Sequence, residues 1–183
     1  LKRKYISSEE VYKTHLYNLT RDIANNLSLD PIKEYAETRG WTPKLLSKYN
    51  IGALSNYAKF LEAMKPKYPE KVLRAVGLIS NSISLFEENR IIFTLHDPKG
   101  RPIGFTGRTL ESGETKRKYV NSSNSSIFKK SNILYNLHRA KNVLNKNKFN
   151  TLYIVEGQAD VISLASHDIF SAVAISGTSF TDN

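Results

Sequence analysis

The stretch that decides the fold is TLYIVEGQADVISLASHDIFSAVAI, residues 151–175. Residues 151–155 are apolar and rich in strand-forming side chains, so they predict a buried strand. A tight turn at 156–157 follows, and apolar side chains at helical spacing predict a helix over 158–167. Residues 172–175 predict a second buried strand. A strand, a helix and a strand in this order form a βαβ unit, so we expect parallel strands with a right-handed crossover.

Two carboxylates stand at one end of this unit. Glu156 follows the first strand, and Asp160 lies in the first turn of the helix. Ligands of open α/β sheets bind beyond the carboxyl ends of the strands, and Mg²⁺ favours carboxylate oxygens, waters and phosphates. The alternative is a purely local role, since an acidic first turn also stabilises the helix dipole. Gly157 is expected to allow a close backbone approach. Gly177 and Thr178 predict either a phosphate-holding loop or a plain turn.

The sequence upstream of this unit predicts a β-hairpin. Residues 90–95 are rich in β-formers, DPKG at 97–100 is a turn signal, and the returning strand spans 102–110. The neighbouring predictions are a short strand over 83–86, an extended piece at 119–120, a polar loop over 121–126, a helix over 131–145 and a linker over 145–150.

The first third of the chain predicts helices. Ser7 and Glu10 have the spacing of a capping box, and apolar residues follow at helical intervals. Asp-Pro at 30–31 and Thr-Pro at 42–43 each place an N-cap before a proline at the first helical position. Further helices are expected over 57–64 and 69–77.

The composition restricts the classes of function. The 183 residues carry a net charge of +10 with a pI of about 9.7, and they include no cysteine. Without cysteine there is no disulfide and no thiolate-bound zinc, and no apolar run is long enough to span a membrane. The positive charge favours a polyanion such as nucleic acid as a binding partner. The alternative is a lysine-rich surface that serves only solubility, which would give the same net charge. The start shows no secretory signal. The absence of cysteine fits a cytoplasmic protein, and Leu1 in place of Met suggests a piece of a longer chain or a chain whose first residues are missing.

The basic residues gather around the hairpin and the segment after it. Cations and aromatic side chains alternate there, which suits a single-stranded nucleic acid because rings stack on bases while cations follow the backbone. The alternative is that the rings pack in the core and the cations are only solvated. The candidate binding residues are Arg90, Arg108, Lys118, Tyr119, Asn121 and Lys130.

Several motifs together resemble those of the polymerase core of DnaG-type DNA primases. RIIFTLHDPKGRPIGFTGR at 90–108 resembles the family's hairpin, which ends in GFGGR. VEGQADVI at 155–162 resembles VEGYMDVI, the start of the family's Toprim domain. The shorter matches are KYVNS at 118–122 with KYLNS, IFKK at 127–130 with IFHK, ILYNL at 133–137 with LYGL, and SGT at 176–178 with LGT. Residues 31–54 also resemble, more loosely, a helical region of the family upstream of the hairpin. The motifs keep the family's order, and the resemblance covers roughly residues 30–180.

The resemblance implies an α+β fold in two parts. Residues 1–148 would form a basic subdomain of helices and a β-hairpin, and residues 149–183 the first βαβ unit of a Toprim domain, a Rossmann-like α/β fold. Glu156 would be the catalytic carboxylate and would share a Mg²⁺ or Mn²⁺ ion with Asp160, while the candidate binding residues would line a groove for template or nucleotide. The family makes short RNA primers from ribonucleotides on single-stranded DNA, beside a replicative helicase and a single-strand-binding protein. No membrane partner is implied.

The chain also departs from the family. It has no cysteine for the family's zinc module, so no zinc is expected in this chain, and Thr106 stands in GFTGR where the family has glycine. The family's later acidic Asp-x-Asp motif would follow Asn183, so the chain alone is not expected to polymerise RNA. A non-catalytic component of a split or degenerate primase that binds single-stranded DNA or a partner is therefore the alternative. The basic hairpin argues against a Toprim nuclease or topoisomerase.

Overall fold

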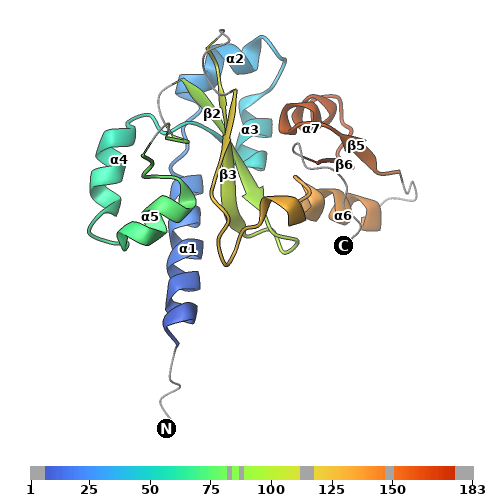
Figure 1. Cartoon of the computed structure of the whole chain (residues 1–183). Coiled ribbons are helices and arrows are strands. Elements are labelled where there is room, and N and C mark those ends of the chain that lie inside the picture. The colour runs from blue at the N-terminus through green and yellow to red at the C-terminus, as the bar shows by residue number, and fades with distance from the viewer. Residues whose placement is uncertain (1–6, 82–83, 87–88, 112–117, 147–150, 176–183) are drawn as a thin grey trace.

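The computed structural model describes residues 7–81, 84–86, 89–111, 118–146 and 151–175, and its centre is an antiparallel sheet (Figure 1). The four strands of this sheet lie in the order β1-β2-β3-β4. Their bounds are Ile51–Gly52 for β1, Arg90–His96 for β2, Pro102–Thr109 for β3 and Tyr119–Asn121 for β4. β2 and β3 form the predicted hairpin, with Phe93 opposite Thr106. Together with the helices, this sheet confirms the predicted α+β class.

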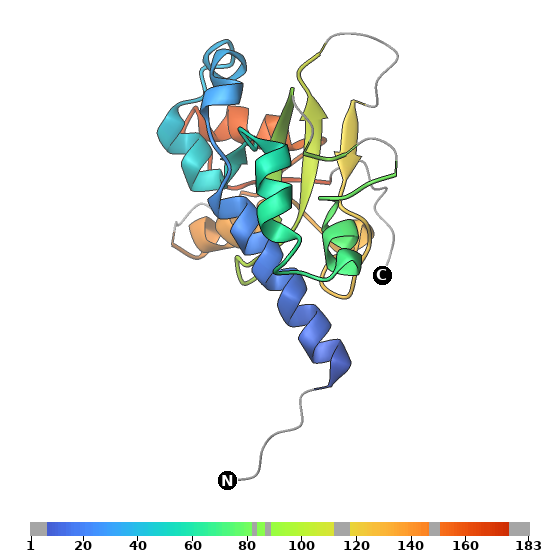
Figure 2. The ribbon, with the colours of Figure 1, turned by 90° about the vertical axis from the view of Figure 1, so that its left-hand side faces the viewer.

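Helices cover both faces of the sheet. One face packs on α1 (Ser8–Asn25), α4 (Tyr57–Met64) and α5 (Glu70–Val76), and Figure 2 shows α1 crossing this side. The other face packs on α2 (Lys33–Glu37), α3 (Pro43–Tyr49) and α7 (Gln158–Ala165).

Side chains alternate along β2 between these two cores. Ile91 and Phe93 enter the core with α2, α3 and α7, whereas Ile92 enters the core with α1 and α5. Every residue of β2 is buried, as expected for an inner strand covered on both faces. Among the helices of the described residues, none has the length and apolar character that a membrane span requires.

The capping signals of the N-terminal helices are largely confirmed. Ser7 and Glu10 form the capping box of α1, and the Thr42 hydroxyl accepts a hydrogen bond from the Leu45 backbone N–H at 3.2 Å. The Asp-Pro pair differs from the prediction: Asp30 is not a side-chain cap but begins a short 3₁₀ helix, η1 (Asp30–Ile32), ahead of α2. The Ile32 N–H bonds back to the Leu29 carbonyl, which tightens this first turn.

The predicted βαβ unit is present, but its first strand is not buried. β5 (Tyr153–Val155) pairs parallel with β6 (Ala172–Ala174), and β6 is fully buried. The side chains of Leu152, Tyr153 and Ile154 are 38%, 44% and 53% exposed. The prediction of a buried strand is therefore wrong for β5. Among the described residues β5 pairs only with β6, so an apolar composition alone overstated its burial.

The helix predicted over 131–145 begins later than expected. A short 3₁₀ helix, η2 (Lys130–Asn132), comes first, and α6 spans Leu137–Lys146. Tyr135 exchanges backbone hydrogen bonds with Ala174 of β6, at 2.9 and 3.2 Å, and Asn136 has a φ of 68°. Neither the bridge nor the left-handed residue is compatible with helix.

Two further predictions fall at the edges of the described residues. The strand predicted over 83–86 is wrong where it is described, because Leu85 and Phe86 lie in a turn, and Ile83 lies outside the described residues. The linker predicted over 145–150 overlaps the end of α6, and residues 147–150 lie outside the described part.

Candidate nucleic-acid and metal site

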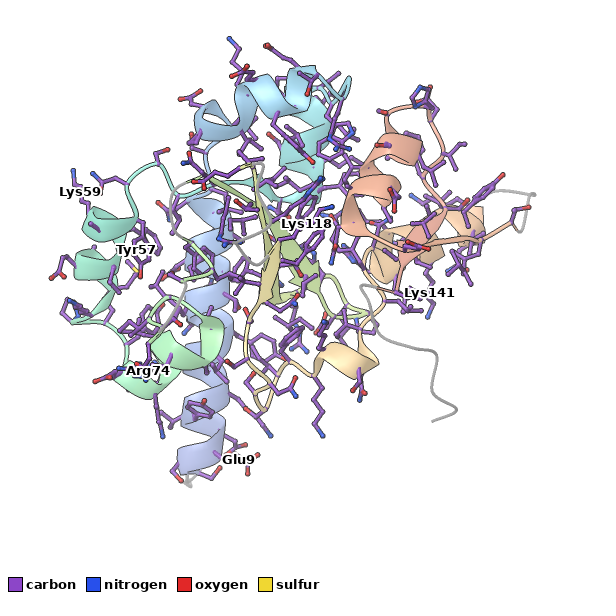
Figure 3. The ribbon with its side chains drawn as sticks, turned by 45° about the horizontal axis from the view of Figure 1, so that its top comes forward. Glu9, Tyr57, Lys59, Arg74, Lys118 and Lys141 are labelled. Atoms are coloured by element: carbon purple, nitrogen blue, oxygen red, sulfur yellow. The ribbon has the colours of Figure 1, made fainter. Side chains whose placement is uncertain are left out.

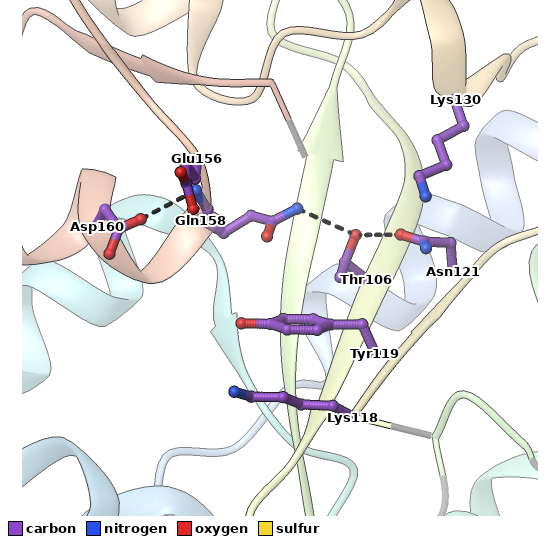
Figure 4. A pocket seen from close by; sticks show the side chains of 9 residues that line it. Thr106, Lys118, Tyr119, Asn121, Lys130, Glu156, Gln158 and Asp160 are labelled. Atoms are coloured by element: carbon purple, nitrogen blue, oxygen red, sulfur yellow. Dashed lines mark hydrogen bonds between the residues drawn. The ribbon is translucent and has the colours of Figure 1, made fainter. Parts of the chain in front are cut away.

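A pocket of about 470 Å³ lies where the βαβ unit meets the β4 edge of the sheet. Its walls come from β3, β4, η2 and the turn into α7 (Figure 4). The lining residues are Thr106, Lys118, Tyr119, Asn121, Lys130, Glu156, Gly157, Gln158 and Asp160. The pocket thus brings together the acidic residues of the βαβ unit and the basic and aromatic residues that follow the hairpin.

The acidic wall is formed by two exposed carboxylates at the start of α7. Asp160 Oδ2 accepts a hydrogen bond from the Gly157 backbone N–H at 3.0 Å, which caps the helix. A carboxylate has two oxygens, so Asp160 can cap the helix through one and present the other to a ligand. Glu156 directly precedes this turn and also lines the pocket. The local and the ligand-binding interpretations of Asp160 are therefore compatible.

Gly157 does not have the steric role expected of it. Its φ is −129°, a value open to any residue, and a Cβ there would lie 3.4 Å from Asp160 Oδ2, which is ordinary contact. Among the described residues, no backbone approaches Gly157 closely enough to require glycine.

The donor set of the acidic wall fits part of a divalent-cation site. Glu156 and Asp160 supply the carboxylate oxygens that Mg²⁺ and Mn²⁺ prefer. The described residues contain no cluster of three or more His, Cys, Asp or Glu side chains that would complete a site. A metal held here would need further oxygens from water, from nucleotide phosphates or from groups beyond the described residues.

The opposite wall is basic and aromatic. Tyr119 and Asn121 lie on β4, Lys118 directly precedes this strand, and Lys130 begins η2. Tyr119 is 40% exposed, so its ring is open to stacking by a base. Figure 3 shows Lys118 near the middle of the molecule, whereas Lys59 lies on the outer helix α4. The pocket therefore places cations across from carboxylates.

Arg108 lies beside the pocket in a stack of cations and rings. Its guanidinium donates a hydrogen bond to the Tyr35 hydroxyl and lies 5.4 Å from the Tyr35 ring and 5.9 Å from the Tyr119 ring. Arg39 lies 4.7 Å from the same Tyr35 ring. Burial raises the pKa of the Tyr35 hydroxyl, although both arginines oppose this shift. The hydroxyl therefore stays neutral and accepts the bond from Arg108.

Sequence reasoning missed four residues of this region: Tyr35, Arg39, Thr106 and Gln158. Tyr35 in α2 and Arg39 in the turn after it are four residues apart, a spacing that was an available signal for a stacked pair. The inward direction of Gln158 had no such signal, because a glutamine at the start of a helix is usually exposed.

The pocket formed by the described residues does not include every predicted site residue. Arg90 is only 3% exposed because it lies on the inner strand β2, so a nucleic-acid strand has no access to it in this conformation. Phe128, an aromatic residue of the basic segment after the hairpin, is 1% exposed, so its ring packs in the core. Gly177 and Thr178 lie outside the described residues.

Comparison with known proteins gives one matching family model. The model described as the N-terminal domain of the DNA primase catalytic core matches residues 16–141. A DNA primase of Geobacillus stearothermophilus is 38% identical over 158 residues, covering 81% of this chain and 25% of the relative. A DNA primase of Clostridium acetobutylicum is 36% identical over 190 residues, covering 98% of this chain and 31% of the relative. The chain thus spans about a quarter to a third of the length of these relatives.

Solved structures with a similar fold include two primase catalytic regions. The zinc-binding and RNA polymerase domains of the Aquifex aeolicus primase match with a TM-score of 0.80 at 29% identity, over 99% of this chain and 45% of that one. A DnaG primase catalytic domain bound to single-stranded DNA matches with a TM-score of 0.78 at 30% identity, over 93% of this chain and 58% of that one.

Proposed function

Because the chain belongs to the DnaG-type DNA primase family, we propose that it forms the template-holding part of an enzyme that synthesises short RNA primers on single-stranded DNA. The observation that carries this proposal is the pocket in which Lys118 and Lys130 lie across from Glu156 and Asp160. A related catalytic domain has been solved with single-stranded DNA bound, which supports the same class of ligand for this chain.

Each wall of the pocket has a role in this proposal. Lys118 and Lys130 neutralise backbone phosphates, and Tyr119 offers a ring for a base. Arg108 extends the cationic wall beyond the pocket, held by Tyr35. Glu156, as the catalytic carboxylate, and Asp160 would hold the divalent ion. When bound, Mg²⁺ or Mn²⁺ would stabilise charge on the phosphoryl oxygens during nucleotide transfer.

The wider activity belongs to the whole enzyme. The chain spans 25% of one curated relative and 31% of another, so the following are proposals for the complete protein. It would transfer nucleotidyl groups from ribonucleotides. It would also act in the cytoplasm beside a helicase and a single-strand-binding protein. We propose that the chain alone does not polymerise, because the described residues of its pocket supply only two carboxylates and the 183 residues contain no Asp-x-Asp motif of the kind the family uses.

Binding of a single-stranded oligodeoxythymidylate tests the proposal. We expect salt-dependent binding, measured by fluorescence anisotropy across a salt series. The Lys118→Ala/Lys130→Ala variant should bind several-fold more weakly at low salt. Its slope of log K against log salt should be shallower by about 1.4, from about 0.7 per lost phosphate contact.

The control is Lys59→Ala, which removes an exposed lysine on α4, away from the pocket (Figure 3). It should leave both the affinity and the slope close to those of the unmodified chain. Equal losses in the control and in the pocket variant would refute a specific cationic wall, and so would binding that does not respond to salt.

A further inference from the structure

A chain of hydrogen bonds joins the two walls of the pocket. The Gln158 side-chain amide Nε2 donates to Thr106 Oγ1 at 3.3 Å, and Thr106 Oγ1 donates to Asn121 Oδ1 at 2.7 Å (Figure 4). We refer to these three residues as the Gln158–Thr106–Asn121 relay. The relay runs from the first residue of α7 through β3 to the last residue of β4.

The relay is buried at its start and reaches the pocket at its end. Gln158 and Thr106 are 3% and 2% exposed, whereas Asn121 is partly exposed. Buried polar groups are costly without partners, so these bonds stabilise both side chains. A threonine hydroxyl has a single proton to donate. Thr106 Oγ1 accepts a hydrogen bond from Gln158 and donates its own hydrogen bond to Asn121 Oδ1. Because the side-chain oxygen of Asn121 accepts this hydrogen bond, the Nδ2 group of Asn121 remains available as a hydrogen-bond donor.

We propose that Gln158 and Thr106 are positioning residues that fix the Asn121 amide with its Nδ2 donor directed at a phosphate oxygen of the bound nucleic acid. The choice of phosphate follows from the neighbours of Asn121, because Lys118 and Lys130 line the same pocket. The inference rests on the proposed function for the identity of its ligand.

The relay also connects the acidic turn to the cationic wall. Gln158 lies two residues after Glu156 and two before Asp160, so its bond to Thr106 anchors that turn against β3. At both Gln158 and Thr106 the chain differs from the family motifs VEGYMDVI and GFGGR, which have tyrosine and glycine there. The two departures meet in one hydrogen bond, so the relay is a feature of this chain rather than of the motifs.

Thr106→Val tests the relay with little change in shape. Valine has nearly the volume of threonine but no hydroxyl, so the Asn121 amide loses its fixed orientation. We expect affinity for oligodeoxythymidylate to fall about 3- to 10-fold, the equivalent of one hydrogen bond. Thr106→Ser keeps the hydroxyl and should restore binding to within about twofold. Gln158→Met removes the first donor and should weaken binding in the same direction.

A double-mutant cycle separates positioning from general loss of stability. In an Asn121→Ala background, Thr106→Val should cause no further loss of affinity, because the residue it positions is gone. A purely structural role would give the same loss in both backgrounds. Unchanged binding by Thr106→Val, or an equal loss in the Asn121→Ala background, overturns the inference.

A readout without nucleic acid keeps this test independent of the proposed function. In the ¹H–¹⁵N spectrum of the free chain, the Asn121 side-chain amide signal should shift in Thr106→Val and stay in place in Thr106→Ser. An unmodified chain that does not bind single-stranded DNA would defeat the proposed function. The relay would then be judged by this signal alone, and its failure to move in Thr106→Val would overturn it.

Discussion

Gly107 lies where β3 passes against the backbone of the turn at 84–86. A Cβ at this position would lie 2.7 Å from the Leu85 carbonyl oxygen and 3.3 Å from Ile92 Cδ1. The carbonyl belongs to the backbone, so the turn itself would have to move. We expect Gly107→Ala to lower the free energy of unfolding by about 1–3 kcal/mol, as for other overpacked sites, measured by urea denaturation.

Gly157→Ser provides the comparison for Gly107. A Cβ at residue 157 makes only ordinary contact at 3.4 Å, and serine is a good N-cap for α7. This variant should unfold close to the midpoint of the unmodified chain. Equal urea midpoints for Gly107→Ala and the unmodified chain would show that the turn at 84–86 moves aside without loss of stability.

At the residue scale, the sequence predicted which side chains lie near one another better than it predicted which of them are buried. Glu156 and Asp160 were predicted at one end of the βαβ unit, from their places after a strand and in the first turn of a helix, and both line the pocket. Arg90 was predicted to line a surface groove, but it is buried on β2. The local sequence did not indicate this, because the packing of helices on both faces of a strand depends on distant parts of the chain. Gln158 was missed for the converse reason, since only the packing of α7 turns it inward.

At the element scale, β2 and α6 meet through two histidines that stay neutral. His96 ends β2 and His138 lies in the first turn of α6, with ring centroids 4.7 Å apart. Burial is the main cause that lowers the pKa of His96 to about 3 and that of His138 to about 4. The positive charge of Arg139 lowers both further, and Asp97 opposes the shift only weakly.

These pKa values predict a loss of stability in mild acid. In the unfolded chain the histidines take up protons near pH 6.5, whereas the folded chain resists protonation until about pH 4. The unfolded state thus binds more protons within this window, so the free energy of unfolding falls as the pH falls through it. His96, which is 8% exposed, contributes at most about 1.4 kcal/mol per pH unit.

Urea denaturation at several values between pH 7 and pH 4 measures this effect. His138→Gln cannot take up the proton, so its free energy of unfolding should depend less steeply on pH than that of the unmodified chain. Carboxylates titrate in both proteins and cancel in the difference. Parallel curves for the two proteins would show that His138 is not held neutral by the fold.

Element boundaries followed the sequence where their signals were local. The capping box of α1 and the hairpin of β2 and β3 depend on neighbouring residues, and both were predicted. The start of α6 was not, because Tyr135 pairs with Ala174 across a long separation in sequence. Tertiary pairing of this kind overrides the helix-forming tendency of residues 131–136, and no pattern in the local sequence predicts it.

At the scale of the whole molecule, one hydrophobic core crosses the predicted boundary between residues 148 and 149. Trp41 and Tyr49 share this core with Val161, Ile162 and Ala172 of the βαβ unit. The Trp41 indole N–H also donates to Ser163 Oγ at 3.3 Å. The boundary stays a prediction about domains, but the shared core leads us to expect that the described parts unfold together.

Trp41 makes this cooperativity measurable, since it is the only tryptophan in the sequence and is 2% exposed. Trp fluorescence and far-UV circular dichroism should give coincident urea transitions. Ile162→Ala, at a fully buried site of α7, should lower the free energy of unfolding by about 2–5 kcal/mol and move both transitions together. Ile154→Ala, on β5 where the side chain is 53% exposed, should change little. If Ile162→Ala shifted only the circular-dichroism transition and left the Trp41 fluorescence transition in place, the βαβ unit would be unfolding independently. The described residues would then form two separately unfolding cores.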